Sequence, residues 1–141
     1  MDTVTTQKRS EIMGRIRSKN SKPELLVRRF LHANGFRFRL HNRNLPGTPD
    51  IVLPRYQTVI LVHGCFWHRH DNCPYASIPS SNREYWINKF KNNKERDKRN
   101  LKDLRKAGFD VIVIWECELN STNALSSLLN RLRRKRLALD D

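Results

Sequence analysis

The sequence predicts one α/β domain in which a mixed central sheet is flanked by helices. The chain has 141 residues, about the length of one ordinary domain, since domains typically span on the order of 100 to 200 residues. Hydrophobic residues make up 38% of it, which is enough to fill a single core. The expected order is helix, three strands, helix, strand, helix, and the connection before the last strand is long enough to join a parallel pair.

The first helix is expected at residues 22–34. Ser21 is a suitable N-cap, Pro23 fits the first helical turn, and Glu24 places an acid near the positive end of the helix. Large apolar side chains then recur at helical spacing until Asn34-Gly35, a common stop signal. The pattern therefore predicts a helix with one buried face.

Three strands are expected next, as an antiparallel meander. From Phe36 to Leu40 apolar and basic residues alternate, which is typical of a strand with one solvated face. Residues 50–53 form the second expected strand, which Pro54 ends. Residues 58–62 are apolar on both faces and so predict a central strand.

The second half of the chain predicts a long loop, a basic helix, a buried strand and a last helix. Residues 63–82 form the loop, whose length is unusual unless something functional orders it. The basic amphipathic helix runs from Asn82 or Arg83 to Ala107, as one helix or as two with a break near Asn92-Asn93. The strand is expected from Phe109 to Trp115 and the last helix at residues 124–137.

The charge of the chain favours a polyanionic partner. The formal net charge is +14 and the isoelectric point is near 10.5, a balance that is common in nucleic-acid-binding proteins. Residues 1–20 are polar and basic and are expected to form an arm that contacts DNA, with residues 21–141 as the single domain. No apolar run is long enough to span a bilayer, so a membrane protein is disfavoured. Three cysteines cannot all pair within one chain, which favours a reducing compartment.

The cysteines and one histidine form a candidate zinc site. Zinc prefers about four thiolate and imidazole ligands in a tetrahedron. The chain supplies such a set if the strand that ends at Trp115 runs beside the strand that ends at Val62; its members are Cys65, His70, Cys73 and Cys117. The alternative is that these are ordinary buried or reactive thiols. All three cysteines enter the set and the loop otherwise lacks a core, so metal binding is favoured.

Asp50, at the start of a strand, is a candidate Mg²⁺ ligand. Mg²⁺ keeps most of its waters and takes only one or two protein carboxylates. Glu24 on the preceding helix and a histidine beyond the strand that ends at Val62 follow the order found in many metal-dependent nucleases. His68 is a candidate base, because histidine is the side chain that most often accepts a proton in catalysis. Taken alone, Pro49-Asp50 is more typical of a turn than of a metal site, and its surroundings favour the metal site.

Phe66-Trp67 is a pair of large aromatic residues in the expected loop. The two rings either pack or stack on nucleic-acid bases. Neighbouring side chains on an extended loop tend to face different directions, so one apolar pocket seldom accommodates both. Met13 on the basic arm could insert between bases in the same way.

Four segments together resemble the very-short-patch-repair (Vsr) DNA mismatch endonucleases, over about residues 8–120. The block at residues 63–68 is highly specific and the Pro-Gly-x-Pro-Asp pattern is supportive. The segments are Leu45-Pro46-Gly47-Thr48-Pro49-Asp50, His63-Gly64-Cys65-Phe66-Trp67-His68, Lys94-Glu95-Arg96-Asp97 and Val113-Ile114-Trp115-Glu116-Cys117.

The resemblance implies a restriction-endonuclease-like fold with a structural zinc. It also implies a Mg²⁺-dependent nick 5′ to the thymine of T:G mismatches, which arise when 5-methylcytosine deaminates. By motif position, Asp50 resembles the Mg²⁺ ligand, His68 the general base, Glu24 an accessory acid near the metal waters, and His63 a phosphate-side partner. The implied zinc set is Cys65, His70, Cys73 and Cys117, and the residues implied to enter the duplex are Phe66, Trp67 and Met13.

Two positions depart from the family pattern. Val62 stands where the family usually has a threonine that offers its main-chain carbonyl to the metal. Val62 can serve in the same way if only the backbone is needed, but not if the threonine hydroxyl also takes part. The segment between His70 and Cys73 is one residue longer than expected, which predicts a bulge in the loop.

Two other functions fit the same residues: a zinc-stapled module that only binds DNA, and a nuclease of this fold without mismatch preference. The expected partner is double-stranded DNA with a T:G mismatch, and other mismatch-repair proteins are candidate partners. The expected location is the bacterial cytoplasm, at the nucleoid. A monomer is expected, because a single asymmetric mismatch requires no more.

Overall fold

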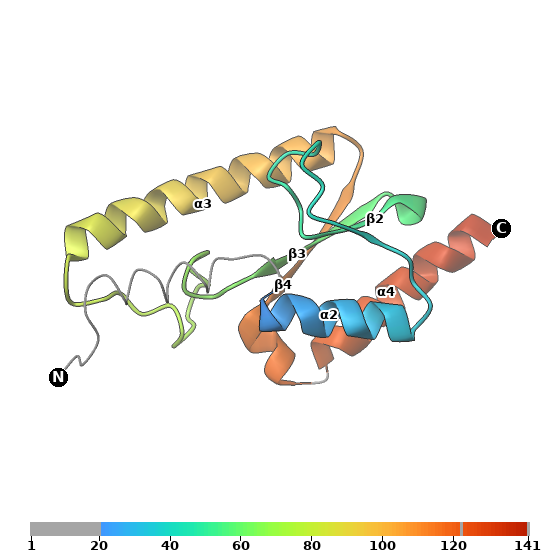
Figure 1. Ribbon diagram of the computed structural model, residues 1–141, viewed down its shortest axis with the longest axis horizontal. Helices are drawn as coiled ribbons and strands as arrows, with labels where there is room; N and C mark the ends of the chain where they lie inside the picture. Colours follow the sequence, from blue (N-terminus) through green and yellow to red (C-terminus); the bar gives the residue numbers. More distant parts are fainter. Residues whose placement is uncertain (1–20, 122, 141) are drawn as a thin grey trace.

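The computed structural model describes residues 21–121 and 123–140, and its described part forms three layers. The predicted basic arm at residues 1–20, with Met13, lies outside the described residues. One sheet stands in the middle, with α3 on one face and α2 and α4 on the other (Figure 1). In chain order the elements are α2 (Lys22–Ala33), β1 (Arg39–Leu40), β2 (Ile51–Leu53), the 3₁₀ helix η1 (Pro54–Tyr56), β3 (Thr58–His63), α3 (Arg83–Lys106), β4 (Asp110–Trp115), the 3₁₀ helix η2 (Glu116–Asn120) and α4 (Asn123–Asp140).

The sheet has the order β1-β2-β3-β4 and is mixed. β1 pairs with β2 and β2 with β3 antiparallel, which confirms the predicted meander. β3 pairs with β4 in parallel over its full length, from Thr58 opposite Asp110 to His63 opposite Trp115. The last residues of both strands therefore meet at one end of the sheet, as the candidate zinc set requires.

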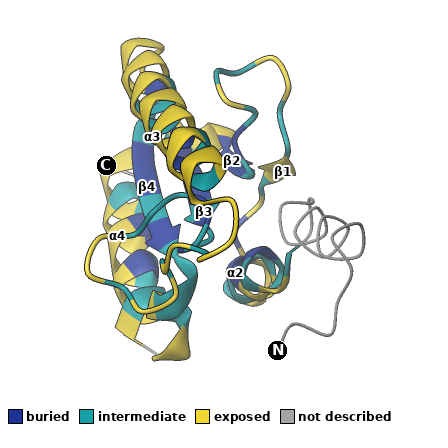
Figure 2. Cartoon of the chain, turned by 90° about the vertical axis from the view of Figure 1, so that its left-hand side faces the viewer, coloured by how far each residue is buried: buried dark blue, intermediate teal, exposed yellow. Residues whose placement is uncertain are grey.

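Two apolar layers cover the two faces of the sheet. Between the sheet and α2 with α4 lies a cluster that includes Val27, Ile60 and Leu132, all fully buried. Between the sheet and α3 lies a smaller cluster around Val59 and Leu104. Figure 2 shows this burial, with β4 mostly dark, whereas β1 and the outer faces of the helices are exposed. The predicted mixed α/β class is confirmed.

Two local features differ from expectation, and a third decides between two predicted alternatives. The first strand is limited to Arg39–Leu40, because the N–H of Phe36 donates to Leu31 and that of Gly35 to His32, which makes Phe36 part of the C-cap of α2. α3 is one unbroken helix of 24 residues, so the alternative with a break near Asn92-Asn93 is wrong. Its Asn93 faces inward and is bonded instead of capping a turn. Two 3₁₀ helices were not expected.

Among the described residues, no helix is both long enough and apolar enough to cross a bilayer.

Candidate active site

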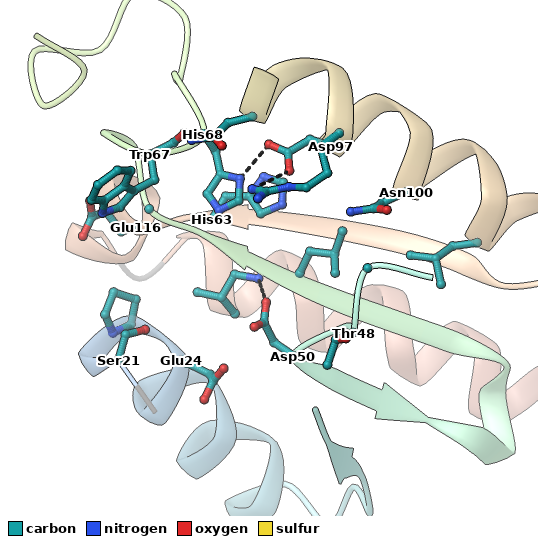
Figure 3. Close-up of a pocket in the computed structure, with 18 of the residues that line it drawn as sticks. Ser21, Glu24, Thr48, Asp50, His63, Trp67, His68, Asp97, Asn100 and Glu116 are labelled. Atoms are coloured by element: carbon teal, nitrogen blue, oxygen red, sulfur yellow. Dashed lines mark hydrogen bonds and ion pairs between the residues drawn. The ribbon is translucent and has the colours of Figure 1, made fainter. Parts of the chain in front are cut away.

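A cleft of about 800 Å³ opens where β2 separates from β3. Its walls come from the N-terminus of α2, the loop before β2, the end of β3 and the middle of α3. Figure 3 shows its lining side chains, with Glu24 and Asp50 toward α2 and with His63, His68 and Asp97 toward α3. The cleft therefore brings together the four residues predicted to be catalytic.

Asp50 occupies the point where the β2–β3 ladder ends. The last paired residues are Ile51 and Ile60, so beyond them the N–H of Val62 has no strand partner on the β2 side. The carboxylate Oδ2 of Asp50 accepts that N–H at 2.9 Å. In a strand the N–H and C=O of one residue point to the same edge, so the carbonyl of Val62 faces the same side as the Asp50 carboxylate.

Glu24 and His41 complete the polar group around Asp50. Nε2 of His41 lies 3.0 Å from Oε1 of Glu24, and Arg28 contacts the other oxygen of Glu24. Glu24, His41 and Asp50 each offer a ligand atom within 4.8 Å of the others. Burial raises the pKa of Asp50 to about 6; the bond from Val62 lowers it, and the carboxylate of Glu24 adds to the rise. A divalent cation would favour the ionised carboxylates of Glu24 and Asp50, and such oxygen donors fit Mg²⁺.

The opposite wall carries two stacked histidines and an aspartate. The rings of His63 and His68 lie 3.9 Å apart with an interplanar angle of 5°. Nδ1 of His68 is 2.7 Å from Oδ2 of Asp97, a residue of α3. Because a carboxylate only accepts, this bond assigns the proton of neutral His68 to Nδ1 and leaves Nε2 as an acceptor.

His63 is buried and neutral. Burial, followed by the charge of His68, lowers the pKa of His63 to about 3. Its Nδ1 atom has no hydrogen-bond partner among the described residues. Since a buried N–H without a partner is costly, the proton of His63 is better placed on Nε2.

Cys65, His70, Cys73 and Cys117 lie together, each with one ligand atom within 4.8 Å of the others. Nδ1 of His70 is 3.7 Å from Sγ of Cys65 and 3.2 Å from Sγ of Cys117. A tetrahedral zinc, with bonds of about 2.3 Å to sulfur and about 2.0 Å to nitrogen, would place sulfur and nitrogen about 3.5 Å apart. Burial raises the pKa of Cys65 to about 12, so without a cation the thiol keeps its proton. The donor set fits zinc.

The loop reaches this arrangement through left-handed turns. Arg69 and Asn72 both have positive φ, of 53° and 55°. Asn72 lies inside the segment that is one residue longer than expected, where its backbone reverses the chain so that Cys73 returns to the cluster. Cys117 lies two residues after the end of β4, in η2, and the parallel pairing of β3 and β4 brings it to the cluster.

Phe66 and Trp67 belong to one aromatic cluster, which contradicts the expectation that a single pocket would not accommodate both. Their ring centroids are 5.1 Å apart, and Trp86 and Phe90 of α3 supply the rest of the wall. Trp67 is buried and Phe66 is half-buried. The guanidinium of Arg69 lies over Phe90 at 3.9 Å from its centroid.

Several residues of the site were missed by sequence reasoning. Asn93 and Asp97 interrupt the apolar stripe of α3 between Phe90 and Leu104, at helical spacing, and polar residues in that stripe are the signal that was available. Trp115 stacks on His70 at 4.3 Å and meets His63 edge-on at 5.1 Å. Glu116 accepts the N–H of Cys65. Glu116 belongs to a segment that resembles the family, but no role was expected for it, and no sequence signal pointed to His41.

The comparisons with known proteins agree on one family. The sequence model of the family described as "DNA mismatch endonuclease Vsr" matches residues 1–74, just over half of the chain. The chain belongs to the Vsr family of DNA mismatch endonucleases. It is therefore an endonuclease that acts on DNA.

Curated Vsr-like relatives match along most of their length. The chain is 49% identical over 134 residues to the type II nicking enzyme V.NmeAIP of Neisseria meningitidis, with 95% of each protein covered. It is 44% identical over 131 residues to the type II nicking enzyme V.XorIIP of Xanthomonas oryzae pv. oryzae, covering 93% of this chain and 96% of the relative. It is 36% identical over 118 residues to the DNA mismatch endonuclease Vsr of Escherichia coli K12, covering 84% and 75%.

Proposed function

We propose that this chain is a Mg²⁺-dependent endonuclease that nicks DNA 5′ to the thymine of T:G mismatches, the product of 5-methylcytosine deamination. One observation carries the proposal. A histidine oriented by an aspartate shares a cleft with a carboxylate and a free strand edge that fit a hard cation, in a chain of the Vsr family. The fold is proposed to be the restriction-endonuclease-like one.

Asp50 and the carbonyl of Val62 would hold Mg²⁺ at the end of β3. When bound, Mg²⁺ supplies positive charge next to the scissile phosphate and favours an ionised leaving oxygen. Only the backbone of Val62 is required for this role, so the valine in place of the usual threonine does not prevent it. Asp50 is positioned for the task before the cation arrives, because its second oxygen is already bonded to Val62.

His68 would act as the general base. Asp97 holds the Nδ1 proton, so the bare Nε2 is available to accept a proton from the attacking water. The carboxylate of Asp97 also stabilises the imidazolium that results. This assignment adds Asp97, as a positioning residue, to the predicted set.

His63 would contact the phosphate as a neutral donor. Its depressed pKa keeps the ring uncharged, and its Nε2–H is the group left to donate. Glu24 would act as an accessory acid, accepting hydrogen bonds from water around the cation. The N-terminus of α2 also lines the cleft, and its dipole favours the negative phosphate.

Phe66 and Trp67 are proposed to enter the duplex beside the mismatch, with Met13 from the basic arm. Unstacking a base step costs a few kcal/mol, which contacts with the deformed duplex can offset. Because Trp67 is buried in the aromatic cluster, this role requires the cluster to open toward DNA. A structural zinc at the four-ligand cluster would hold the loop that carries both rings.

The partner and location proposals follow from the same function. We propose a monomer that acts on double-stranded DNA at the nucleoid, with other mismatch-repair proteins as candidate recruiters.

The deciding experiment is incubation of an end-labelled T:G duplex with purified protein and Mg²⁺, with the cut mapped by strand and position. We expect one nick, 5′ to the mismatched thymine, that requires Mg²⁺. Asp50→Ala and His68→Ala should lower the single-turnover rate by at least about 100-fold with little loss of affinity for the duplex. His32→Ala changes an exposed histidine of α2 and serves as the control. Full activity in the first two variants would remove the assignment.

The second candidate is a nuclease of the same fold without mismatch preference. Nicking of a T:G duplex is compared with nicking of a matched duplex at the same salt concentration. Basic contacts raise the affinity for both duplexes alike, so only a preference for the mismatch makes the two nicking rates differ. Equal nicking of the two duplexes would establish the second candidate. Trp67→Ala should weaken binding to the T:G duplex most, whereas an equal loss on both duplexes would indicate a packing role.

A further inference from the structure

We propose that His41 is a positioning residue of the Mg²⁺ site, acting through Glu24. The inference rests on the proposed function and adds to it a residue that the sequence did not point to. His41 lies directly after β1, at the edge of the sheet, and reaches a glutamate 17 positions earlier in the chain.

His41 contacts both Glu24 and Asp50, the first through its ring and the second through its backbone. Its backbone N–H donates to the carbonyl of Asp50 at 3.1 Å, which continues the β1–β2 ladder by one residue. Its ring Nε2 donates to Oε1 of Glu24 at 3.0 Å. Any displacement of Asp50 along the sheet therefore moves the group that holds Glu24.

Glu24 is held at both of its oxygens. Arg28, one helical turn further along α2, contacts Oε2, and His41 contacts Oε1 from the sheet. The side chain of Glu24 is only 4% exposed and that of His41 14%, so water competes little for these bonds. Two donors at separate oxygens fix the plane of the carboxylate, and so they fix the directions from which it accepts hydrogen bonds.

The backbone of His41 is strained in a way that serves this contact. Its φ is 47°, in the left-handed region, which residues other than glycine seldom adopt because of steric strain. In a regular strand, successive side chains point to opposite faces of the sheet. The left-handed backbone of His41 breaks this alternation, and its imidazole contacts Glu24 of α2.

A fixed Glu24 matters because of how Mg²⁺ binds. The ion keeps several of its waters in a strict octahedron, so the groups that accept hydrogen bonds from those waters define its position as much as its direct ligands do. Loss of such an outer partner typically costs about 10- to 100-fold in metal affinity or activity. Loss of His41 should therefore lower the affinity for the divalent cation, while the affinity for DNA should remain intact.

The test compares two variants of the full chain with the wild type. His41→Gly removes the ring and relieves the left-handed strain, so the fold is retained. His41→Gln restores a donor at the end of a side chain of similar reach. His32→Ala, an exposed histidine of α2 outside the cleft, is the matched control.

Three measurements are made on each protein. They are the single-turnover nicking rate of a T:G duplex against Mg²⁺ concentration, the affinity for Mn²⁺ measured without DNA by electron paramagnetic resonance, and the affinity for DNA in Ca²⁺. We expect His41→Gly to need about 10- to 100-fold more Mg²⁺ and to bind Mn²⁺ more weakly by a similar factor. His41→Gln should recover most of both losses, and DNA affinity should stay within about twofold.

A double-mutant comparison shows whether His41 acts through Glu24. In a Glu24→Gln background, His41→Gly should cause no further loss of Mn²⁺ affinity. An undiminished additional loss would overturn the inference, and so would a His41→Gly protein with wild-type Mg²⁺ and Mn²⁺ dependence. If the wild type fails to nick the T:G duplex, the proposed function fails, and Mn²⁺ affinity alone then decides the role of His41.

Discussion

The buried carboxylate of Asp50 lowers the stability of the metal-free protein, although the proposed Mg²⁺ site requires it. This carboxyl group is buried beside Glu24, and burial is the main reason that its pKa rises from 3.8 to about 6. A folded-state pKa above the unfolded value stabilises the fold at low pH, and this stabilisation is lost as the pH rises through about 6. Above that pH the metal-free protein therefore contains a buried negative charge that only a cation or a donor can offset.

Asp50→Asn should make the metal-free protein more stable at pH 8 and inactive. Asparagine keeps an acceptor for the N–H of Val62 but removes the charge, which is worth up to about 3 kcal/mol for a pKa rise of this size. Urea unfolding without Mg²⁺ should show a clear difference from wild type at pH 8 and a much smaller one near pH 4. Added Mg²⁺ should stabilise only the wild type. A variant that is less stable than wild type at pH 8 would contradict this account.

Asp97→Asn should impair the chemical step without unfolding the site. An asparagine amide can donate to Nδ1 of His68 and so favour the wrong tautomer, with the proton on Nε2. Where a carboxylate orients a catalytic histidine in this way, the same change lowers kcat by up to about 10⁴-fold. Single-turnover nicking at saturating Mg²⁺ measures the loss, and Asp103→Asn, at an exposed position of the same helix, is the control. Equal rates for the two variants would exclude the role of Asp97.

At the scale of elements, local patterns predicted most of the fold. The 22–34 helix, the meander and the parallel fourth strand follow from cap residues, apolar runs and connection length, and the structure has all of them. The first strand was too long because alternation does not reveal that Phe36 completes the C-cap of α2. The backbone N–H groups of Gly35 and Phe36 bond to residues three and five positions earlier, at the end of α2, and not to a neighbouring strand. The alternation of apolar and basic residues does not reveal these bonds.

The candidate site was predictable where its residues are unusual in themselves. Histidines and cysteines crowded into one loop are conspicuous, and the structure brings the four candidate zinc ligands together. The role of Glu116 was not predictable although its segment was noted, because only the fold brings it to the N–H of Cys65. His41 was not predictable at all, because ordinary surface sequences contain such residues. His41 in particular depends on a left-handed backbone and on a glutamate from another element.

The loop between β3 and α3 should lose its function when zinc is removed. Trp115 lies between His70 of the candidate zinc cluster and His63 of the cleft, so disorder in the cluster reaches the histidine pair through this ring. We expect about one zinc per chain in purified protein. Cys117→Ser, or chelation of the wild type, should change the fluorescence of the tryptophans and abolish nicking. Added zinc should restore the chelated wild type but not the variant, and a folded, active, zinc-free protein would refute the assignment.

At the scale of the whole molecule, charge and shape act together. The net charge of +14 is spread over several helices, but only some basic residues stand at the cleft. Lys22 and Arg96 line it, whereas Arg133 and Arg134 lie in the C-terminal half of α4 and do not. Figure 1 shows that half of α4 at the end of the molecule away from the start of α2. A comparison of variants in the two pairs can therefore distinguish direct contacts with phosphates from the effect of the overall charge.

Removing either pair lowers the net charge by the same amount, yet the effects on DNA binding should differ. Each phosphate neutralised contributes about −0.9 to the slope of log affinity against log salt concentration. Lys22→Ala with Arg96→Ala should therefore make the slope less negative by about 1.8, on T:G and matched duplexes alike, because phosphate contacts carry no sequence information. Arg133→Ala with Arg134→Ala should leave the slope nearly unchanged. Fluorescence anisotropy between about 50 and 200 mM salt measures both, and equal changes in the two double variants would mean that DNA is attracted by net charge alone rather than seated on the cleft.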